Sequence, residues 1–450
     1  MVNRNTFFKV LINLILAAVA MFVYFDGKNY YDIFITLSII SLLVFVAILI
    51  TNPTGIASPY MLFIIVMFVY NCGQVWLNLF GVPIISGNYT ITRYSDDLLS
   101  ISLLFFILMV LSINIFFLSG IHDWKKSKGD FYKNEEAESK SGYFVLFWIS
   151  FFVCLVYDFL QYRIAASSGY VAALYARSEN ELLYMCNCVF PFVIFLGLRL
   201  NIPWKQKVVI TILSAIRYAV TTVLIGYRMQ AIAFVLSLLV LLPSIVLEKN
   251  KRKFNVLMII GIVLAGALSI YAADLRRGNS YIGLLDSYNS LIQELGGTFT
   301  DLPIVFRDID YIGTAYGLSY VCAVIYLIPM AGHFFPEMAR YVNLSSILYQ
   351  RITIYGGSSL GGSMLAEFFY NFNWLSLIIA GPAVGFFLAK ICNSLNENKC
   401  NPYRTAMLTY VFYIMLLFVR GNIGEVTIYI RCAVYIAIIR AFINRSRCLR

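Results

Sequence analysis

Two arginines stand in an otherwise apolar stretch, "TILSAIRYAVTTVLIGYRMQAIAFVLSLLVLL", which runs from Thr211 to Leu242. Arg217 and Arg228 are eleven residues apart, which is three helical turns plus about 20°, so a continuous helix would carry both on one face. A guanidinium keeps its proton in a protein and cannot become neutral to suit an apolar environment. Such groups usually face a bundle interior or a wet cavity. The stretch therefore predicts an outward-opening anion site with Arg228 at its floor. The alternative is that Arg217 pairs with a buried acid such as Asp158 while Arg228 reaches the lipid headgroups.

More arginines follow in the segment 273–362. Arg276 and Arg277 stand side by side at its start, and Arg351 lies near its end. Guanidinium is a flat fork of several donors that suits phosphate oxygens, and it is less strongly hydrated than a lysine ammonium. We predict that these three arginines, with Arg228 and Arg217, bind a phosphate-bearing ligand. The alternative is that arginine predominates in this segment only because the lysines are confined to the other side of the membrane.

Three side chains could transfer a proton beside such a ligand. Glu294 belongs to a stretch whose apolar spacing predicts an amphipathic helix lying on the membrane, with its acids turned to the site or to water. His333 has an unperturbed pKa of about 6.5, which suits a base, although a packed loop histidine is the plainer interpretation. Glu367 interrupts an apolar run and is either a catalytic base or the counter-ion of an arginine.

The motifs of metal and cofactor chemistry are weak or missing in the sequence. Asp308 and Asp310 form a D-x-D, which can hold a divalent metal against a sugar diphosphate, but two acids in a polar loop are common by chance. Walker A, H-E-x-x-H and dinucleotide-binding sequences are absent, and the nine cysteines are scattered. We therefore predict no cofactor, no metal site and no nucleic-acid partner.

The composition indicates the kind of fold that must position these residues. The chain is 60% hydrophobic and 13% charged, with a mean hydropathy of +0.79. Repeated apolar runs of roughly 20 residues, separated by short polar breaks, are typical of an all-α polytopic membrane protein. We predict one transmembrane domain, 1–450, of about twelve spans. They lie near 7–24, 33–50, 60–80, 98–119, 143–162, 182–200, 208–226, 229–247, 254–273, 364–389, 405–419 and 427–443.

The distribution of the lysines predicts the orientation of the chain in the membrane. If both termini are cytoplasmic, every lysine except Lys28 falls on the inner side, as the positive-inside rule requires. The segment 273–362, between the ninth and tenth spans, then forms one large outer loop, and loops of this length are usually functional. It includes "TAYGLSYVCAVIYLIPM" (314–330), which is too short to span comfortably and which we interpret as re-entrant or interfacial.

Two stretches resemble a known family. "IGYRMQAIAF" is similar to the "G-S-R" segment of the O-antigen and capsule repeat-unit polymerases of the Wzy type, with Tyr227 where serine is usual. "GGSSLGGSMLAEFFYNFNWLSLIIAGPAVGFFLAK" resembles the family's stretch ending in E-x-x-x-N-F-G, with Asn373 in place of the glycine. The many spans and the large outer loop before the last ones also resemble the family's layout.

The resemblance implies a GT-C-like helical glycosyltransferase of the bacterial inner membrane. Such an enzyme moves a growing glycan from undecaprenyl pyrophosphate onto another lipid-linked repeat unit at the periplasmic face. It implies that Arg228, Arg276 and Arg277 lie at the pyrophosphate. The expected partners are lipid-linked oligosaccharides, membrane lipids, and the flippase and chain-length regulator of the same pathway.

Two other functions fit part of the sequence. An O-antigen ligase would share the fold and the donor but would use lipid A core as its acceptor. A lipid-linked oligosaccharide flippase or transporter would also have about twelve spans, but the large outer loop argues against it.

Overall fold

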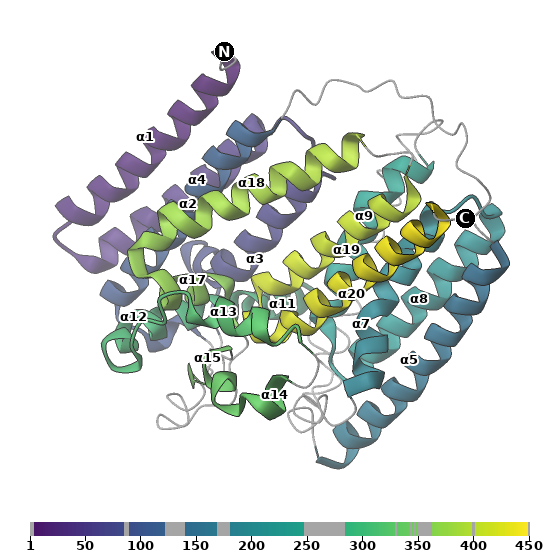
Figure 1. Cartoon of the computed structure of the whole chain (residues 1–450). Coiled ribbons are helices and arrows are strands. Elements are labelled where there is room, and N and C mark those ends of the chain that lie inside the picture. The colour runs from purple at the N-terminus through teal and green to yellow at the C-terminus, as the bar shows by residue number, and fades with distance from the viewer. Residues whose placement is uncertain are drawn as a thin grey trace.

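The protein is almost wholly helical where its structure is described. The computed structural model describes residues 4–84, 90–121, 140–168, 181–246, 284–328, 331–342, 344, 347–348, 362–397 and 401–448. The long helices are α1 (Arg4–Asp26), α2 (Tyr30–Thr51), α3 (Pro59–Leu79), α4 (Asp96–Gly120), α5 (Lys140–Ser168), α7 (Glu181–Arg199), α8 (Trp204–Leu224), α9 (Arg228–Val246), α18 (Ser376–Glu397), α19 (Pro402–Val419) and α20 (Ile423–Cys448). Figure 1 shows them running roughly side by side.

Shorter elements gather at one end of this bundle, below it in Figure 1. They are η1 (Ile91–Arg93), α11 (Leu284–Gly296), η3 (Gly297–Thr300), α12 (Asp301–Ile312), α13 (Leu318–Ile325), α14 (Ala331–Phe334), η4 (Pro336–Met338), α15 (Ala339–Val342), α17 (Met364–Phe372) and η5 (Asn373–Leu375). Most of them come from the segment between α9 and α18, and α11 and α17 carry Glu294 and Glu367.

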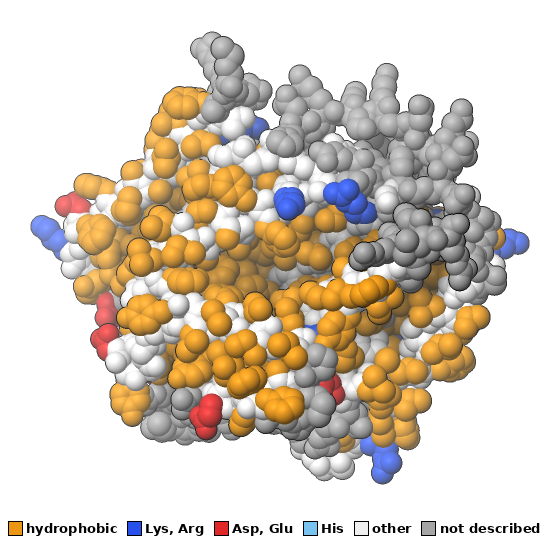
Figure 2. All heavy atoms as spheres, viewed as in Figure 1, with side chains coloured by type: hydrophobic (Ala, Val, Ile, Leu, Met, Phe, Trp, Pro, Cys, Tyr) orange, Lys and Arg blue, Asp and Glu red, His pale blue; other side chains and the backbone are white. Residues whose placement is uncertain are grey.

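The predicted class, a polytopic helical membrane protein, is confirmed. Nine stretches within the described ranges are long and apolar enough to cross a membrane. They match the spans expected from 7–24 to 208–226, and those at 364–389 and 405–419. The span expected at 254–273 lies outside the described residues. The spans expected at 229–247 and 427–443 correspond to α9 and α20, which are not among the nine, and the apolar part of α9 is a shorter helix, Arg228–Leu241. The total of twelve therefore stays a prediction. Figure 2 shows hydrophobic side chains over most of the visible face with only scattered charges, as a lipid-facing surface requires.

Small residues let the helices approach one another closely. A Cβ on Gly385 of α18 would lie 2.4 Å from the Ile113 carbonyl oxygen of α4, and one on Gly381 would lie 2.3 Å from the Ser112 hydroxyl oxygen. The Ser112 hydroxyl also donates to the Leu377 carbonyl at 2.7 Å. Close backbone contact and interhelical hydrogen bonds replace the hydrophobic driving force that is missing between helices in lipid.

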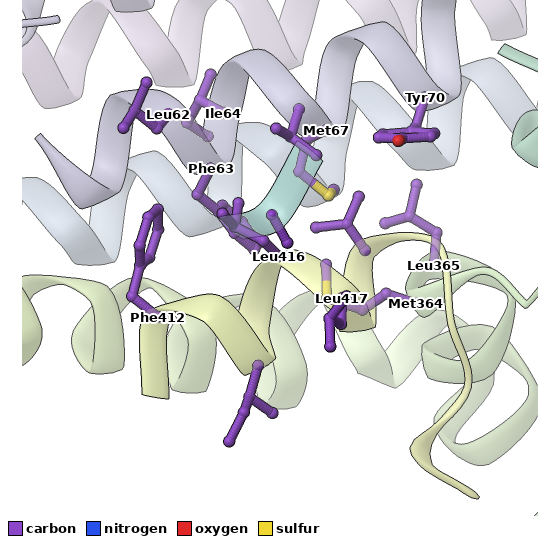
Figure 3. Packing of buried hydrophobic residues seen from close by; sticks show 14 of the residues in the cluster. Leu62, Phe63, Ile64, Met67, Tyr70, Met364, Leu365, Phe412, Leu416 and Leu417 are labelled. Carbon is purple, nitrogen blue, oxygen red and sulfur yellow. The ribbon is translucent and has the colours of Figure 1, made fainter. Parts of the chain in front are cut away.

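A dense apolar core joins α3 to α19 and α17. Figure 3 shows Phe63 and Met67 of α3 facing Phe412 and Leu416 of α19. Tyr70 lies beside Leu365 of α17 in this cluster. The Tyr70 side chain also borders the candidate site described below.

The segment expected as one span at 364–389 is broken. Helix α17 ends at Phe372, and α18 begins at Ser376 after the short turn η5. The break is at Asn373, whose φ of +50° and ψ of −140° belong to a region that favours glycine. This explains why a glycine is usual at this place in the resembling motif, because only glycine adopts this backbone without a steric penalty.

The apolar segment 314–330 forms a helix too short to cross a membrane. Helix α13 has 8 residues, which is about 12 Å of helix. Its Val321 and Val324 are more than half exposed, whereas Cys322 and Ala323 are buried. An interfacial or re-entrant segment would have this form. The position of the large loop relative to the membrane stays a prediction.

Candidate functional site

Arg217 is bound to the acid that the sequence suggested as its alternative partner. Its Nε and Nη2 donate to the two carboxylate oxygens of Asp158 at 2.6 and 2.9 Å, and Nη2 also donates to the Asn187 side chain. The Arg217 and Asp158 side chains are only 4% and 11% exposed. This bidentate pair joins α8, α5 and α7 inside the bundle. Its geometry supports the bracing interpretation, and a role for Arg217 at a ligand stays a prediction.

Arg217 and Arg228 do not share one helix, which corrects the expectation that they lie on a common helical face. Helix α8 ends at Leu224, and Arg228 is the first residue of α9. Between them Gly226 adopts a φ of +94°, a left-handed conformation that L side chains rarely accept. The Tyr227 hydroxyl donates to the Gln161 side chain at 3.1 Å and holds the turn to α5. The turn therefore places Arg228 at the end of the bundle.

Arg228 and Glu294, both singled out from the sequence, meet across 65 intervening residues of sequence. The Arg228 Nη1 lies 2.5 Å from the Glu294 Oε1. The arginine side chain is 7% exposed and the glutamate side chain 31% exposed, so the glutamate lies on the more open side of the pair. The Arg228 Nε has no hydrogen-bond partner in the described part of the chain.

Helix α11 carries Glu294 to this place because it packs directly on α3. A Cβ on Gly296 would lie 2.5 Å from the Gln74 backbone nitrogen, and one on Gly73 would lie 3.0 Å from the Ile292 carbonyl oxygen. The Gln74 amide donates to the Gln293 carbonyl at 2.7 Å. The amphipathic helix expected here is therefore present, but it packs against the bundle rather than only lying on the membrane.

Arg420 belongs to this site, although the sequence distinguished it only as one of about ten arginines expected on the outer side of the membrane. It ends α19, and its guanidinium carbon lies 5.7 Å from the centre of the Tyr70 ring. Arg420 is hydrogen-bonded to the Tyr70 side chain, which is also within electrostatic range of Arg228 and Glu294. The Tyr70 hydroxyl lies 2.9 Å from the Met229 Sδ, next along the chain from Arg228. Tyr70 therefore joins the two arginine-bearing turns. The feature of the sequence that could have identified Arg420 is its position directly after an apolar span, in "LLFVRGN".

Asp301, the first residue of α12, adds a buried acid to this group. It is 1% exposed, and its Oδ2 has no hydrogen-bond partner within the described ranges. Burial raises the pKa of Asp301 well above its ordinary value, Arg420 opposes this effect, and Glu425 adds to it. Sequence reasoning missed Asp301 because an acid in a polar loop gives no sign of burial.

Glu367 is fully buried and already bound by two neutral donors. One carboxylate oxygen accepts from the Ser319 hydroxyl at 3.0 Å, and the other accepts from the Ile423 backbone N–H at 2.9 Å. The Ser319 hydroxyl also lies 2.9 Å from the Asn371 Oδ1, and the Asn371 amide donates to the Glu367 carbonyl at 2.9 Å. Glu367 thus ties α17 to α13 and to the start of α20, where a carboxylate complements the helix dipole. These contacts match neither an arginine counter-ion nor an open base, and a catalytic role stays a prediction.

The remaining predicted residues are not brought into this group by the described structure. Arg276, Arg277 and Arg351 lie outside the described residues. The backbone of His333 belongs to α14, but its side chain is also outside the description.

The D-x-D acids are not arranged as metal ligands. Asp308 accepts two hydrogen bonds from Arg307, both at 3.0 Å. Asp308 and Asp310 lie two residues apart in α12, so their side chains diverge by about 200° around the helix. Within the described ranges, no group of three or more histidine, cysteine or acidic side chains could hold a metal ion.

Comparison with known families identifies the class of this protein. The family model described as O-antigen polysaccharide polymerase Wzy matches residues 5–447, nearly the whole chain. The chain belongs to this family. The comparisons with curated proteins and with solved structures found no match. The resemblance drawn from the two sequence stretches is therefore confirmed. A Wzy polymerase is a multi-pass membrane protein that joins lipid-linked O-antigen repeat units by glycosyl transfer.

Proposed function

We propose that this Wzy polymerase transfers a growing glycan from undecaprenyl pyrophosphate to another lipid-linked repeat unit at the periplasmic face of the bacterial inner membrane. The observation that supports this most is the meeting of Arg228, Glu294 and Arg420 around Tyr70. The buried guanidinium of Arg228 and the partly buried one of Arg420 lie beside a carboxylate at one end of a helical bundle. Such groups are suited to a lipid diphosphate whose hydrocarbon chain stays in the membrane.

The orientation rests on lysine distribution. With both termini in the cytoplasm, the inner loops carry every lysine but Lys28, and the arginine cluster lies outside. The partners proposed with this orientation are the flippase that delivers the repeat units and the regulator of chain length.

The proposed reaction needs charge stabilisation and one proton acceptor. The acceptor hydroxyl oxygen bonds to the anomeric carbon of the donor glycan. The bond from that carbon to the phosphate oxygen breaks, and its electron pair leaves with the undecaprenyl diphosphate. Arg228, Arg276, Arg277 and Arg351 stabilise the leaving negative charge, while Arg217 braces the bundle or extends their field. Glu294, Glu367 or His333 accepts the hydroxyl proton.

Arg228→Ala tests this proposal directly. We expect it to abolish long glycan chains, because a buried phosphate-binding donor is lost, while the protein still inserts in the membrane. The measurement is the ladder of lipopolysaccharide chain lengths on a gel, with membrane levels of the protein determined by immunoblot. Arg163→Ala is the matched control, because Arg163 is an exposed arginine near the end of α5.

Two results would count against the proposal. A normal ladder from Arg228→Ala would remove Arg228 from the mechanism. A deletion strain that attaches no repeat units at all, rather than a single one, would indicate a ligase instead of a polymerase.

A further inference from the structure

The turn between α12 and α13 holds a tyrosine in a backbone conformation that tyrosine rarely adopts. Tyr316 has a φ of +49°, and the next residue, Gly317, has a φ of +81°. The Leu318 N–H closes the turn by donating to the Ala315 carbonyl at 2.8 Å. Glycine, asparagine and aspartate dominate turns in which both central residues have a positive φ, and a bulky side chain there is an outlier. Tyr316 therefore carries backbone strain that glycine at the same position would not carry.

Packing within the described structure does not explain why this strain is retained, because Tyr316 is 86% exposed. The backbone around it is fixed. The Ala315 N–H donates to the Tyr370 carbonyl of α17 at 2.9 Å, and a Cβ on Gly317 would lie 3.2 Å from the Phe372 ring. Strained residues are concentrated at ligand sites, and a ring this exposed gains binding energy from a molecule outside the chain.

The end of α12 places further groups beside this turn. Tyr311, in the last turn of α12, is 79% exposed. Asp308 lies three residues earlier and so on the same helical face, and Arg307 donates two hydrogen bonds to its carboxylate. The face of an aromatic ring is partially negative and stacks on the C–H bonds of a sugar ring, and a carboxylate keeps further lone pairs for sugar hydroxyls. Exposed tyrosines beside such a pair are suited to a saccharide.

Lipid headgroups are the other molecules that an exposed tyrosine at this end of the bundle could contact. Val321 and Val324 of α13 are more than half exposed, as expected close to a membrane surface. A fluid headgroup layer accepts a tyrosine ring in many orientations, so it gives no reason for a strained turn. A sugar ring is rigid and stacks well only on an aromatic ring that is held in the matching orientation, which the fixed turn provides. The strain of Tyr316 therefore favours a saccharide.

We propose that Tyr316 and Tyr311, with the Arg307–Asp308 pair, form a saccharide-binding surface that holds the glycan of a lipid-linked repeat unit. The inference rests on the proposed function, because its ligand is the glycan part of the proposed substrate. The residues of this surface are not those proposed for the diphosphate, so the two can be tested separately.

The test measures binding of a delipidated glycan to the full-length protein in phosphatidylcholine nanodiscs by isothermal titration calorimetry. The probe is the surface polysaccharide of the strain that encodes the protein, cleaved from its lipid by mild acid. Tyr316→Ala and Tyr311→Ala should each weaken binding roughly threefold to tenfold, because one stacking contact is lost. Tyr316→Phe should retain binding, since stacking needs the ring and not the hydroxyl. Tyr31→Ala, the matched control, should leave binding unchanged, because it removes a 54% exposed tyrosine from the first turn of α2.

Tyr316→Gly separates a binding role from a structural one. Glycine relieves the strain and removes the ring, so this variant should have an equal or higher thermal midpoint and yet bind the glycan more weakly. Unchanged binding by both Tyr316→Gly and Tyr316→Ala would refute the inference in favour of contact with lipid headgroups. Weakening by Tyr31→Ala as large as that by Tyr316→Ala would also refute it, because the effect would not be specific to this turn.

Failure of this inference can be distinguished from failure of the proposed function. The probe carries no diphosphate, so Arg228→Ala should bind it as the wild-type protein does. If the wild-type protein binds no glycan while Arg228→Ala abolishes long chains, this inference fails and the proposed function stands. A normal ladder from Arg228→Ala, together with glycan binding that depends on Tyr316, would instead count against the proposed function and support this surface.

Discussion

Removing Asp158 should destabilise the protein strongly, whereas removing the whole Arg217–Asp158 pair should not. The two side chains share hydrogen bonds of 2.6 and 2.9 Å and are almost fully buried, so solvent does not screen their interaction. The Arg217 guanidinium also lies 4.9 Å from the centre of the Phe190 ring. Asp158→Ala would leave this guanidinium in place with an uncompensated charge.

The expected magnitude follows from that burial. Loss of one member of a buried pair costs about 3–5 kcal/mol, because the remaining charge has no solvent and no counter-ion. Replacement of both members by apolar residues of similar size is neutral or stabilising by about 1–4 kcal/mol. We therefore expect Asp158→Ala to lower the free energy of unfolding by about 3–5 kcal/mol, and Asp158→Leu with Arg217→Met to restore most of that loss.

Denaturation in detergent micelles and the lipopolysaccharide ladder would be measured for each variant. Asp308→Ala is the matched control, because it breaks a more exposed pair with Arg307, a kind worth about 0–1 kcal/mol. If Arg217 is a brace, the double variant should keep long chains. Their loss in a stable double variant would show that Arg217 contacts the ligand. A loss of stability in Asp158→Ala no larger than that of the control would refute the reasoning about burial.

Three further predictions concern single residues. Asn373→Gly should raise the free energy of unfolding by about 1 kcal/mol, because glycine removes the strain at φ +50°; a lower thermal midpoint would contradict it. Gly296→Ala should shorten the chain-length ladder, because its Cβ would lie 2.5 Å from the Gln74 nitrogen and push α11 away from α3; a full ladder would show that this contact does not position Glu294. Burial raises the pKa of Asp301 above its ordinary 3.8, so the folded chain holds this proton more tightly than the unfolded chain does. The stabilisation that protonated Asp301 contributes is therefore lost as pH rises from about 4 through the pKa of Asp301 in the folded protein. Asp301→Asn should flatten the fall of the thermal midpoint as pH rises above about 4, and an unchanged slope would count against it.

Several features of this polymerase follow from sequence alone. Long apolar runs determine the membrane-spanning helices, because backbone polar groups in lipid must bond within their own segment. The same logic identified Arg217, Arg228 and Glu367, since a charged group in an apolar run needs a partner or a function. Glu294 was identified instead from the amphipathic spacing of its own stretch. Asp158 could be named as a partner of Arg217 for this reason alone, and the pair is present.

The tertiary structure decided which of these groups meet. Arg228 pairs with Glu294 only because α11 packs on α3, and the Glu367 carboxylate is hydrogen-bonded because α13 and α20 begin beside it. Arg420 and Asp301 enter the site through contacts between segments more than a hundred residues apart in sequence. Helical periodicity reports which face of one helix is apolar, but it holds no information about which other helix that face will meet. That choice depends on the shape and volume of many side chains packing at once, and so only the folded protein reveals it.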